Sequence, residues 1–196
     1  MIILLGFPKS GTTSFHNLFK SIGIESYHQN YRRAIIACEI YKNYNRNKPL
    51  FSFLKRKNNK IAITQLDVCH SHTRNLWPQI TLFKEIYNQN KDSIFILNTR
   101  KPEIILSSFK RWIYLNKSYF ERFILYNYDM IKDLEGNNDE EKFIKLINIH
   151  YENIRNFFKD KNTKFIDFDI EHDDISKLSK YINLKGNNKF PHSNKN

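Results

Sequence analysis

The chain has 196 residues, 40% of them hydrophobic, which is enough to form one domain around one core. It carries 32 Lys and Arg against 20 Asp and Glu, a formal net charge of +12, which favours anionic partners such as nucleotides, acidic glycans, nucleic acids or membrane surfaces. The two cysteines lack CxxC spacing, which argues against a disulfide framework and a cysteine zinc site. The sequence shows neither a signal-peptide pattern nor an apolar run of membrane-spanning length, so we expect a soluble cytoplasmic protein.

The chain begins with a pattern of strand, loop and helix. Residues 2–5 are apolar and rich in β-branched side chains, as in a strand that is buried on both faces. After a turn over residues 6–11, Leu18, Phe19 and Ile22 recur at helical spacing until Gly23. This order predicts the start of a βαβ unit.

The rest of the chain continues the alternation of strands and helices. Strands are predicted over residues 61–66, 93–97 and 164–168, and helices over residues 75–88, 102–114, 119–134 and 140–158. Alternation of this kind predicts an α/β fold with an open, mostly parallel sheet, helices on both faces, and ligands at the carboxyl ends of the strands. We interpret residues 1–196 as a single domain whose polar tail, residues 185–196, is mobile unless a nucleotide orders it as a lid.

Residues 6–14, Gly-Phe-Pro-Lys-Ser-Gly-Thr-Thr-Ser, have the glycine spacing of a P-loop. Glycines in such a loop let successive backbone N–H groups and the next helix N-terminus face an anion. Thr12 stands where P-loop kinases and NTPases carry the lysine that reaches the β- and γ-phosphates. Lys9 lies inside the loop instead, which suits a shorter group at the α-phosphate position, so the loop is typical of a site for a 5′-monophosphate derivative.

This loop resembles the 5′-phosphosulfate loop of the sulfotransferase family, in which a Pro-Lys-Ser-Gly-Thr-Thr core holds 3′-phosphoadenosine 5′-phosphosulfate (PAPS). The resemblance implies a P-loop, sulfotransferase-like fold and an enzyme that moves a sulfuryl group from PAPS to a hydroxyl or amine acceptor, releasing 3′-phosphoadenosine 5′-phosphate (PAP), with no metal required. It assigns donor binding to the matching residues, which are Pro8, Lys9, Ser10, Gly11, Thr12, Thr13 and Ser14.

A second phosphate site is predicted where the strand 93–97 ends. Arg100 follows this strand, and Ser108 falls within the apolar stripe that Ile105, Phe109 and Trp112 form on the next helix. A buried hydroxyl without a partner costs about 1–3 kcal/mol, and an anion held with Arg100 would supply that partner. Sulfotransferases bind the 3′-phosphate with an Arg after a strand and a Ser eight residues later, and this pair has that separation. Taken alone, a surface Arg and a Ser that bonds its own backbone explain the pair equally well.

Two candidate bases follow the strand 61–66, namely Asp67 and His70. Sulfuryl transfer needs a base for the acceptor and positive charge at the departing phosphate oxygen, which Lys9 and the loop amides can provide. The resemblance favours Asp67 by position, although Cys69 replaces a proline that is common two residues later. His70 competes because its ordinary pKa is near neutrality, whereas the pKa of Asp67 must be raised by burial. A loop that only caps the following helix is the third interpretation.

The acceptor side is expected in basic and aromatic stretches, residues 31–33, 42–57 and 110–111, which suit a small-molecule or glycan acceptor of anionic or phenolic character. Solvated helix faces explain these stretches as well. Residues 190–194, Phe-Pro-His-Ser-Asn, resemble a C-terminal element of one branch of small sulfotransferases that closes over the nucleotide. Two other functions stay open: a small-molecule P-loop kinase, which would need a lysine in place of Thr12, and a basic nucleic-acid-binding protein, for which no recognised motif is present.

Overall fold

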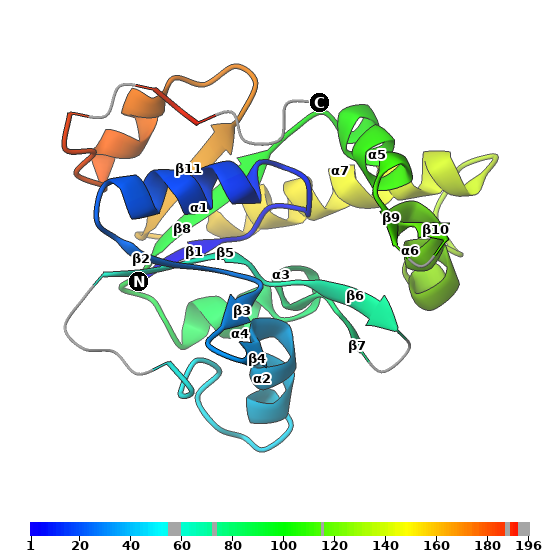
Figure 1. Ribbon diagram of the computed structural model, residues 1–196, viewed down its shortest axis with the longest axis horizontal. Coiled ribbons are helices and arrows are strands. Elements are labelled where there is room, and N and C mark those ends of the chain that lie inside the picture. Colours follow the sequence, from blue (N-terminus) through cyan, green and yellow to red (C-terminus); the bar gives the residue numbers. More distant parts are fainter. Residues whose placement is uncertain (55–59, 72–73, 115, 187–188, 192–196) are drawn as a thin grey trace.

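The computed structural model describes the backbone of residues 1–54, 60–71, 74–114, 116–186 and 189–191, and the side chains of these residues except 70, 71 and 74. A five-stranded sheet in the order β11-β8-β1-β5-β2 lies at its centre (Figure 1). Every neighbouring pair in this sheet is parallel, so the predicted α/β fold with an open, mostly parallel sheet is confirmed. The strands are β1 (Ile2–Leu4), β2 (Glu25–His28), β5 (Ile61–Gln65), β8 (Ile94–Thr99) and β11 (Lys164–Asp169).

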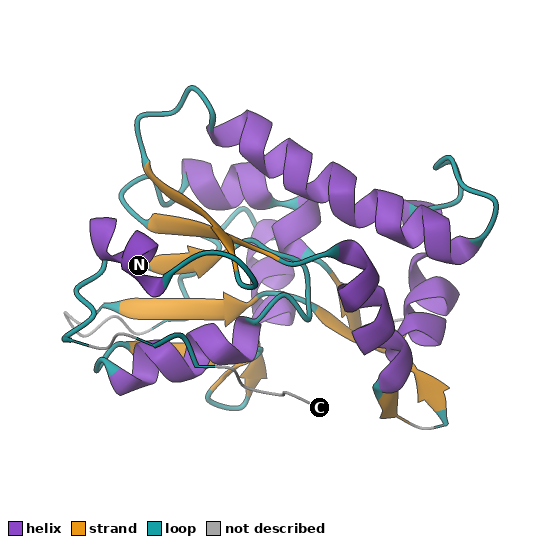
Figure 2. Cartoon of the chain, turned by 90° about the horizontal axis from the view of Figure 1, so that it is seen from above, coloured by secondary structure: helices purple, strands orange, loops and turns teal. Residues whose placement is uncertain are grey.

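Helices cover both faces of the sheet, as Figure 2 shows from above. Ile2 and Leu4 enter a core that α1 and the 3₁₀ helix η2 complete, whereas Ile3 and Leu5 enter a larger core formed with the other helices. Because both faces are buried, β1 reads as an unbroken apolar run in the sequence. The helices are α1 (Thr12–Ser21), α2 (Ile36–Tyr44), α3 (Pro78–Thr81), α4 (Phe83–Asn88), α5 (Pro102–Arg111), α6 (Tyr119–Asn127), η1 (Tyr128–Met130), α7 (Asp139–Phe158) and η2 (Ile175–Lys180).

The predicted helix 75–88 starts later than expected and is divided into α3 and α4. Pro78 starts α3 because its fixed φ and missing N–H suit a first helical position, and Trp77 before it has φ −132° and ψ 63°, outside the helical region. The preceding residues form β7 (Arg74–Leu76), which pairs antiparallel with β6 (Val68–Ser71). The segment after β5 is therefore a hairpin, and the prediction of a helix from residue 75 is wrong.

The predicted helix 102–114 ends at Arg111, where Trp112 adopts extended backbone angles. A short hairpin follows, built from β9 (Ile113–Tyr114) and β10 (Lys117–Ser118). Ser118 then begins α6 with a reciprocal capping box: its hydroxyl accepts from the Glu121 backbone N–H, and the Glu121 carboxylate accepts from the Ser118 N–H. This helix starts where it is predicted but ends at Asn127, since that residue leaves the helical region.

The segment between α1 and β5 contains elements that the sequence did not predict. β2 forms an edge of the sheet, and its mixture of polar and aromatic residues lacks the apolar run of a central strand. A small hairpin, β3 (Asn30–Tyr31) with β4 (Ala34–Ile35), leads from it into α2. In the part of the chain that the structure describes, no helix is long and apolar enough to cross a membrane, and no group of three or more His, Cys, Asp and Glu side chains could hold a metal ion.

Candidate active site

A cavity of about 700 Å³ lies where the central strands end. The loop after β1, the start of α1, the residues that follow β8 and β11, Ser108 of α5 and Phe190 line one part of it, and residues from β2, β5, β6 and α6, the end of α5 and the hairpin after it line the other. We call these the donor side and the acceptor side. The carboxyl ends of parallel strands are where ligands bind in open α/β sheets, so this cavity is the candidate active site.

The loop after β1 is fixed to the sheet by Asn98 of β8. The Gly6 N–H donates to Asn98 Oδ1 at 3.0 Å, and Asn98 Nδ2 donates to the Ser10 carbonyl oxygen at 2.9 Å and to Ser10 Oγ at 2.6 Å. A Cβ atom on Gly6 would lie 2.0 Å from the Asn98 carbonyl oxygen, so only glycine allows this close approach. The shape of the loop is therefore set before any ligand binds.

Two residues of the loop have left-handed backbone angles, Lys9 with φ 69° and Gly11 with φ 83°. For the non-glycine Lys9 this conformation costs about 1–2 kcal/mol, and such costs are concentrated in ligand-binding loops. α1 begins at Thr12 directly afterwards and has no acidic residue in its first turn. The loop and the helix N-terminus together form the type of concave backbone site that binds phosphate or sulfate groups.

Six of the seven residues predicted to bind the donor group line the cavity. Ser10 is the exception: it is fully buried, and its hydroxyl donates to the Phe7 carbonyl oxygen and accepts from Asn98. Ser10 thus stabilises the loop on its buried side, away from the cavity. The six that line the cavity are Pro8, Lys9, Gly11, Thr12, Thr13 and Ser14.

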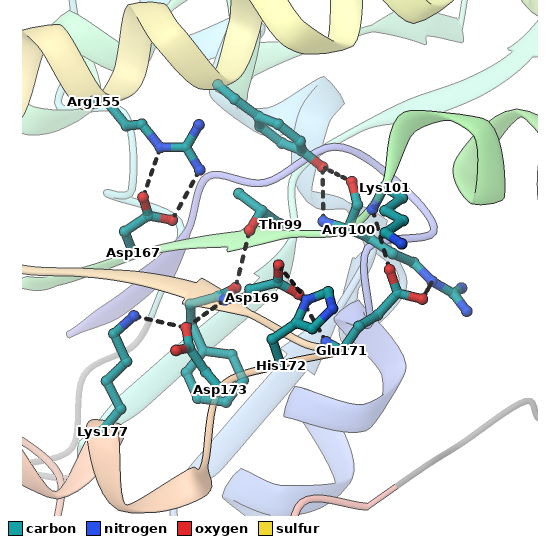
Figure 3. Close-up of polar contacts among 12 residues, drawn as sticks. Thr99, Arg100, Lys101, Arg155, Asp167, Asp169, Glu171, His172, Asp173 and Lys177 are labelled. Carbon is teal, nitrogen blue, oxygen red and sulfur yellow. Dashed lines mark hydrogen bonds and ion pairs between the residues drawn. The ribbon is translucent and has the colours of Figure 1, made fainter.

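The predicted second phosphate site lies beside this loop. Arg100 Nη1 donates to the Lys9 carbonyl oxygen at 3.4 Å, and both Arg100 and Ser108 line the cavity. Arg100 Nε is buried and has no hydrogen-bond partner in the described part of the chain. Glu171, which follows β11, places Oε1 3.6 Å from this Nε and accepts from the Lys101 N–H through Oε2 (Figure 3). The guanidinium lies on the same side of the sheet as the loop, as the hypothesis of two neighbouring phosphate sites requires.

α7 positions the ends of the two strands that carry these sites. The Arg100 N–H donates to the Tyr151 hydroxyl at 3.3 Å, and that hydroxyl lies 3.5 Å from the Arg100 carbonyl oxygen. Burial lowers the pKa of His150 to about 4, so its ring is neutral and Nε2 donates to the Leu5 carbonyl oxygen at 2.7 Å. These bonds satisfy backbone groups at the points where β1 and β8 end.

Asp67 lies directly behind the wall of the cavity and is fully buried. Its Oδ2 accepts from Gln65 Nε2 at 3.1 Å and from the Tyr119 hydroxyl at 3.2 Å, and its Oδ1 accepts from Gln79 Nε2 at 3.2 Å. Burial raises the pKa of Asp67 to about 6, although the hydrogen bonds and the charge of Lys9 act in the opposite direction. A carboxylate with this pKa is ionised at neutral pH and can accept a proton.

Lys9 faces this carboxylate across the cavity wall. Burial lowers the pKa of Lys9 to about 8, Asp67 opposes this shift, and the charge of Arg122 adds to it. Its Nζ lies 2.9 Å from the centroid of the Trp112 ring and 5.6 Å from that of Tyr119. Trp112 was predicted as part of the buried stripe of α5, but it is 57% exposed because the helix ends before it. The ring covers the Lys9 ammonium instead of joining the core.

Two histidines bear on the choice of base, the predicted His70 and one that was not predicted. His70 lies on β6, and its side chain is outside the described part of the structure. His28, which the sequence analysis missed, stands at the end of β2 and lines the acceptor side. Its Nδ1 lies 3.3 Å from Thr64 Oγ1, and burial lowers its pKa to about 4. No local motif marks His28, because it enters the site through an edge strand.

The basic stretches expected to bind the acceptor lie mostly away from the cavity. Of their residues that the structure describes, only Arg111 is among those that line it. Tyr31 is buried in the larger core, and Lys110 pairs with Glu140 of α7. Residues 55–57 of the second stretch are outside the described residues. Solvated faces and core packing explain most of these residues, and the acceptor side is built from other segments.

The C-terminal element reaches the donor side of the cavity through Phe190. Its ring packs against Phe15 of α1 and Phe168 of β11, with centroid distances of 4.9 Å and 5.4 Å. Residues 192–194 of the predicted element lie outside the described residues. Phe190 therefore packs in the smaller core and also lines the cavity.

In a comparison with protein families, a family model described as a sulfotransferase domain matches residues 1–196. A search of curated proteins gives no match. The matched region contains the loop after β1, the end of β8 and both sides of the cavity.

Proposed function

The chain belongs to the sulfotransferase family, and on this premise we propose that it transfers a sulfuryl group from PAPS to a hydroxyl or amine of a small-molecule or glycan acceptor, releasing PAP. One observation carries the choice of donor: Arg100 Nη1 reaches the carbonyl oxygen of Lys9 in the phosphate loop. Two anion-binding groups from different strand ends thus share one cavity. A 3′-phosphate close to a 5′-phosphate distinguishes PAPS from ATP.

The residues present fit a doubly phosphorylated adenosine. The loop amides, Lys9 and the N-terminus of α1 suit the 5′-phosphosulfate, and Thr12 in place of a lysine argues against a nucleoside triphosphate. Arg100 and Ser108 suit the 3′-phosphate, because Arg100 Nε has only the 3.6 Å ion-pair contact with Glu171 and no hydrogen bond, and so offers a charge-assisted hydrogen bond. This arrangement supports the sulfotransferase function over the small-molecule kinase.

In the proposed mechanism, bound PAPS supplies the sulfuryl group that the acceptor receives. Lys9 remains protonated at neutral pH, since its pKa is about 8, and its ammonium stabilises negative charge at the bridging oxygen of the 5′-phosphate. The proton of the acceptor hydroxyl or amine passes to the Tyr119 hydroxyl, which belongs to a residue that lines the cavity, as the Tyr119 proton passes to Oδ2 of Asp67. Gln65, which also lines the cavity, donates a second hydrogen bond to the same oxygen and fixes its position behind the wall.

The experiment that tests this function measures transfer of radiolabelled sulfate from PAPS to a panel of hydroxyl and amine acceptors. Wild-type protein should label at least one acceptor, and Lys9→Ala should lower kcat by about 100-fold or more, because one positive group at a developing charge is worth that much. Lys20→Ala, an exposed change in the last turn of α1, is the matched control. Wild-type rates in Lys9→Ala would remove Lys9 from the reaction. A wild-type protein that binds no PAP and labels no acceptor would contradict the function.

A further inference from the structure

The acceptor side contains a buried arginine that the mechanism above does not use. Arg122, on α6, is only 7% exposed, yet it lines the cavity. Its Nη1 donates to the Cys69 carbonyl oxygen at 3.1 Å, while its Nε is buried and has no hydrogen-bond partner in the described structure. None of the ion pairs among the described residues includes Arg122.

This arrangement is unusual because a guanidinium stays charged at any physiological pH. Removing such a charge from water without a counter-ion is costly, so buried arginines are normally paired with a carboxylate or bind an anionic ligand. The rings of Tyr119 and Tyr114 lie 5.1 Å and 5.2 Å from the Arg122 Cζ atom and offset part of that cost through cation–π contacts. They do not supply the missing hydrogen-bond acceptor.

The edge of Arg122 that carries Nε has the geometry of a carboxylate site. Since Nη1 is engaged with Cys69, the unpartnered Nε belongs to the side-on edge of the guanidinium, which it forms with Nη2. Two parallel N–H groups on one edge match the two oxygens of a carboxylate. The Tyr114 and Tyr119 rings lie beside Arg122, and the Trp112 ring lies 6.4 Å from that of Tyr119. All three residues line the cavity, and their flat rings suit an unsaturated or aromatic body for the ligand.

We propose that Arg122 is the recognition residue for a carboxylate on the acceptor, so that the preferred acceptors are planar hydroxyl compounds that also carry a carboxylate. This inference rests on the proposed function, which brings the acceptor hydroxyl to the Tyr119 hydroxyl in front of Asp67. Tyr119 connects the two groups: its hydroxyl donates to Asp67, and its ring lies beside Arg122. Tyr119 thereby links an acceptor bound to Arg122 with the base Asp67. Lys9 is close to both charged groups, since the charges of Asp67 and Arg122 both shift the pKa of Lys9.

A different role for Arg122, contact with the sulfuryl group of the donor, has a different consequence. An arginine that binds the transferring group affects every acceptor equally. An arginine that binds the acceptor carboxylate affects only acceptors that have one. A matched pair of probes separates the two roles: 4-hydroxyphenylacetate, which carries a carboxylate, and 4-hydroxyphenylacetamide, its neutral analogue of nearly the same shape.

The experiment uses the full chain and measures calorimetric binding of both probes, with and without PAP, and their kcat/KM as acceptors. Wild-type protein should prefer the carboxylate by about 10-fold or more, the effect of a charge-assisted pair of hydrogen bonds. Arg122→Gln should remove most of this preference. Arg122→Lys, which keeps the positive charge but not the pair of parallel N–H donors, should retain only part of it. Arg46→Gln, at an exposed position after α2, is the control for a lost positive charge.

Each outcome decides the inference. Equal affinity of the wild-type protein for the two probes overturns it, and this measurement does not depend on whether the Arg122 variants fold. An equal loss of kcat/KM with both probes in Arg122→Gln also overturns it and assigns Arg122 to the donor group. PAP binding is read separately: if PAP binds and the carboxylate is not preferred, the inference fails while the proposed function stands. If PAP does not bind, the proposed function fails, and the binding of the two probes to the free protein still decides whether Arg122 recognises a carboxylate.

Discussion

The donor side and the acceptor side of the cavity are built in different ways. On the donor side, a continuous loop is bonded to the neighbouring strand through Asn98, and Arg100 directly follows that strand. On the acceptor side, single side chains such as His28 and Arg122 arrive from an edge strand and a helix that are far apart in the sequence. Backbone groups suit phosphates that every member of a family binds, whereas separate side chains can change with the acceptor. Substitutions on one side should therefore leave the other side's ligand largely unaffected.

The largest effect is expected for Asp67→Asn, which removes the proposed base. The rate should fall by about 100- to 10,000-fold, the range for general base catalysis, while PAP affinity changes by no more than about threefold. Transfer assays and calorimetry measure the two quantities on the same preparation. A large loss of PAP affinity would contradict the claim that the donor side and the acceptor side act independently.

The dependence of kcat/KM on pH sharpens the same assignment. Asp67 must be ionised, so the rate should fall as pH drops through about 6, and Lys9 must be protonated, so it should fall again as pH rises through about 8. His28→Asn should still show the fall in kcat/KM near pH 6, since the pKa of His28 is about 4. If the fall in kcat/KM near pH 6 is absent in His28→Asn and still present in Asp67→Asn, His28 is the base instead of Asp67.

Arg100→Ala should have an intermediate effect, confined to the donor side. PAP should bind about 10- to 100-fold more weakly, because charge-assisted hydrogen bonds to the 3′-phosphate are lost, whereas AMP, which lacks that phosphate, should bind as before. Calorimetry with both nucleotides gives the difference directly, and Arg46→Ala is the exposed control. An unchanged ratio of the two affinities would remove Arg100 from the nucleotide site.

Glu171→Gln should have the smallest effect and the opposite sign. The Glu171 carboxylate lies 3.6 Å from Arg100 Nε and repels a phosphate that approaches the same guanidinium. Because the pair is partly exposed and screened, the neutral amide should raise PAP affinity by only about 3- to 10-fold, and less at high salt. Weaker PAP binding would mean that Glu171 orients Arg100 for the phosphate.

The sequence predicted the sheet and the donor side because their signals are local. The central strands are apolar runs, and Pro8 to Ser14 form one contiguous motif after the first of them. Asp67 was found for the same reason, since it directly follows a buried strand. His28 and Arg122 gave no such signal: one lies on a polar edge strand, and the other lies on a helix whose buried face can be read only once α6 is packed beside β6. Trp112 was placed in the core because helical periodicity does not show where a helix ends.

Calorimetric titration of the wild-type protein with PAP and with ATP tests the central claim most directly. If the loop at Lys9 and the guanidinium of Arg100 bind the two ends of one nucleotide, PAP should bind at least about 10-fold more tightly than ATP, since ATP lacks the 3′-phosphate and the loop lacks the P-loop lysine. Equal affinities, or tighter binding of ATP, would contradict the account.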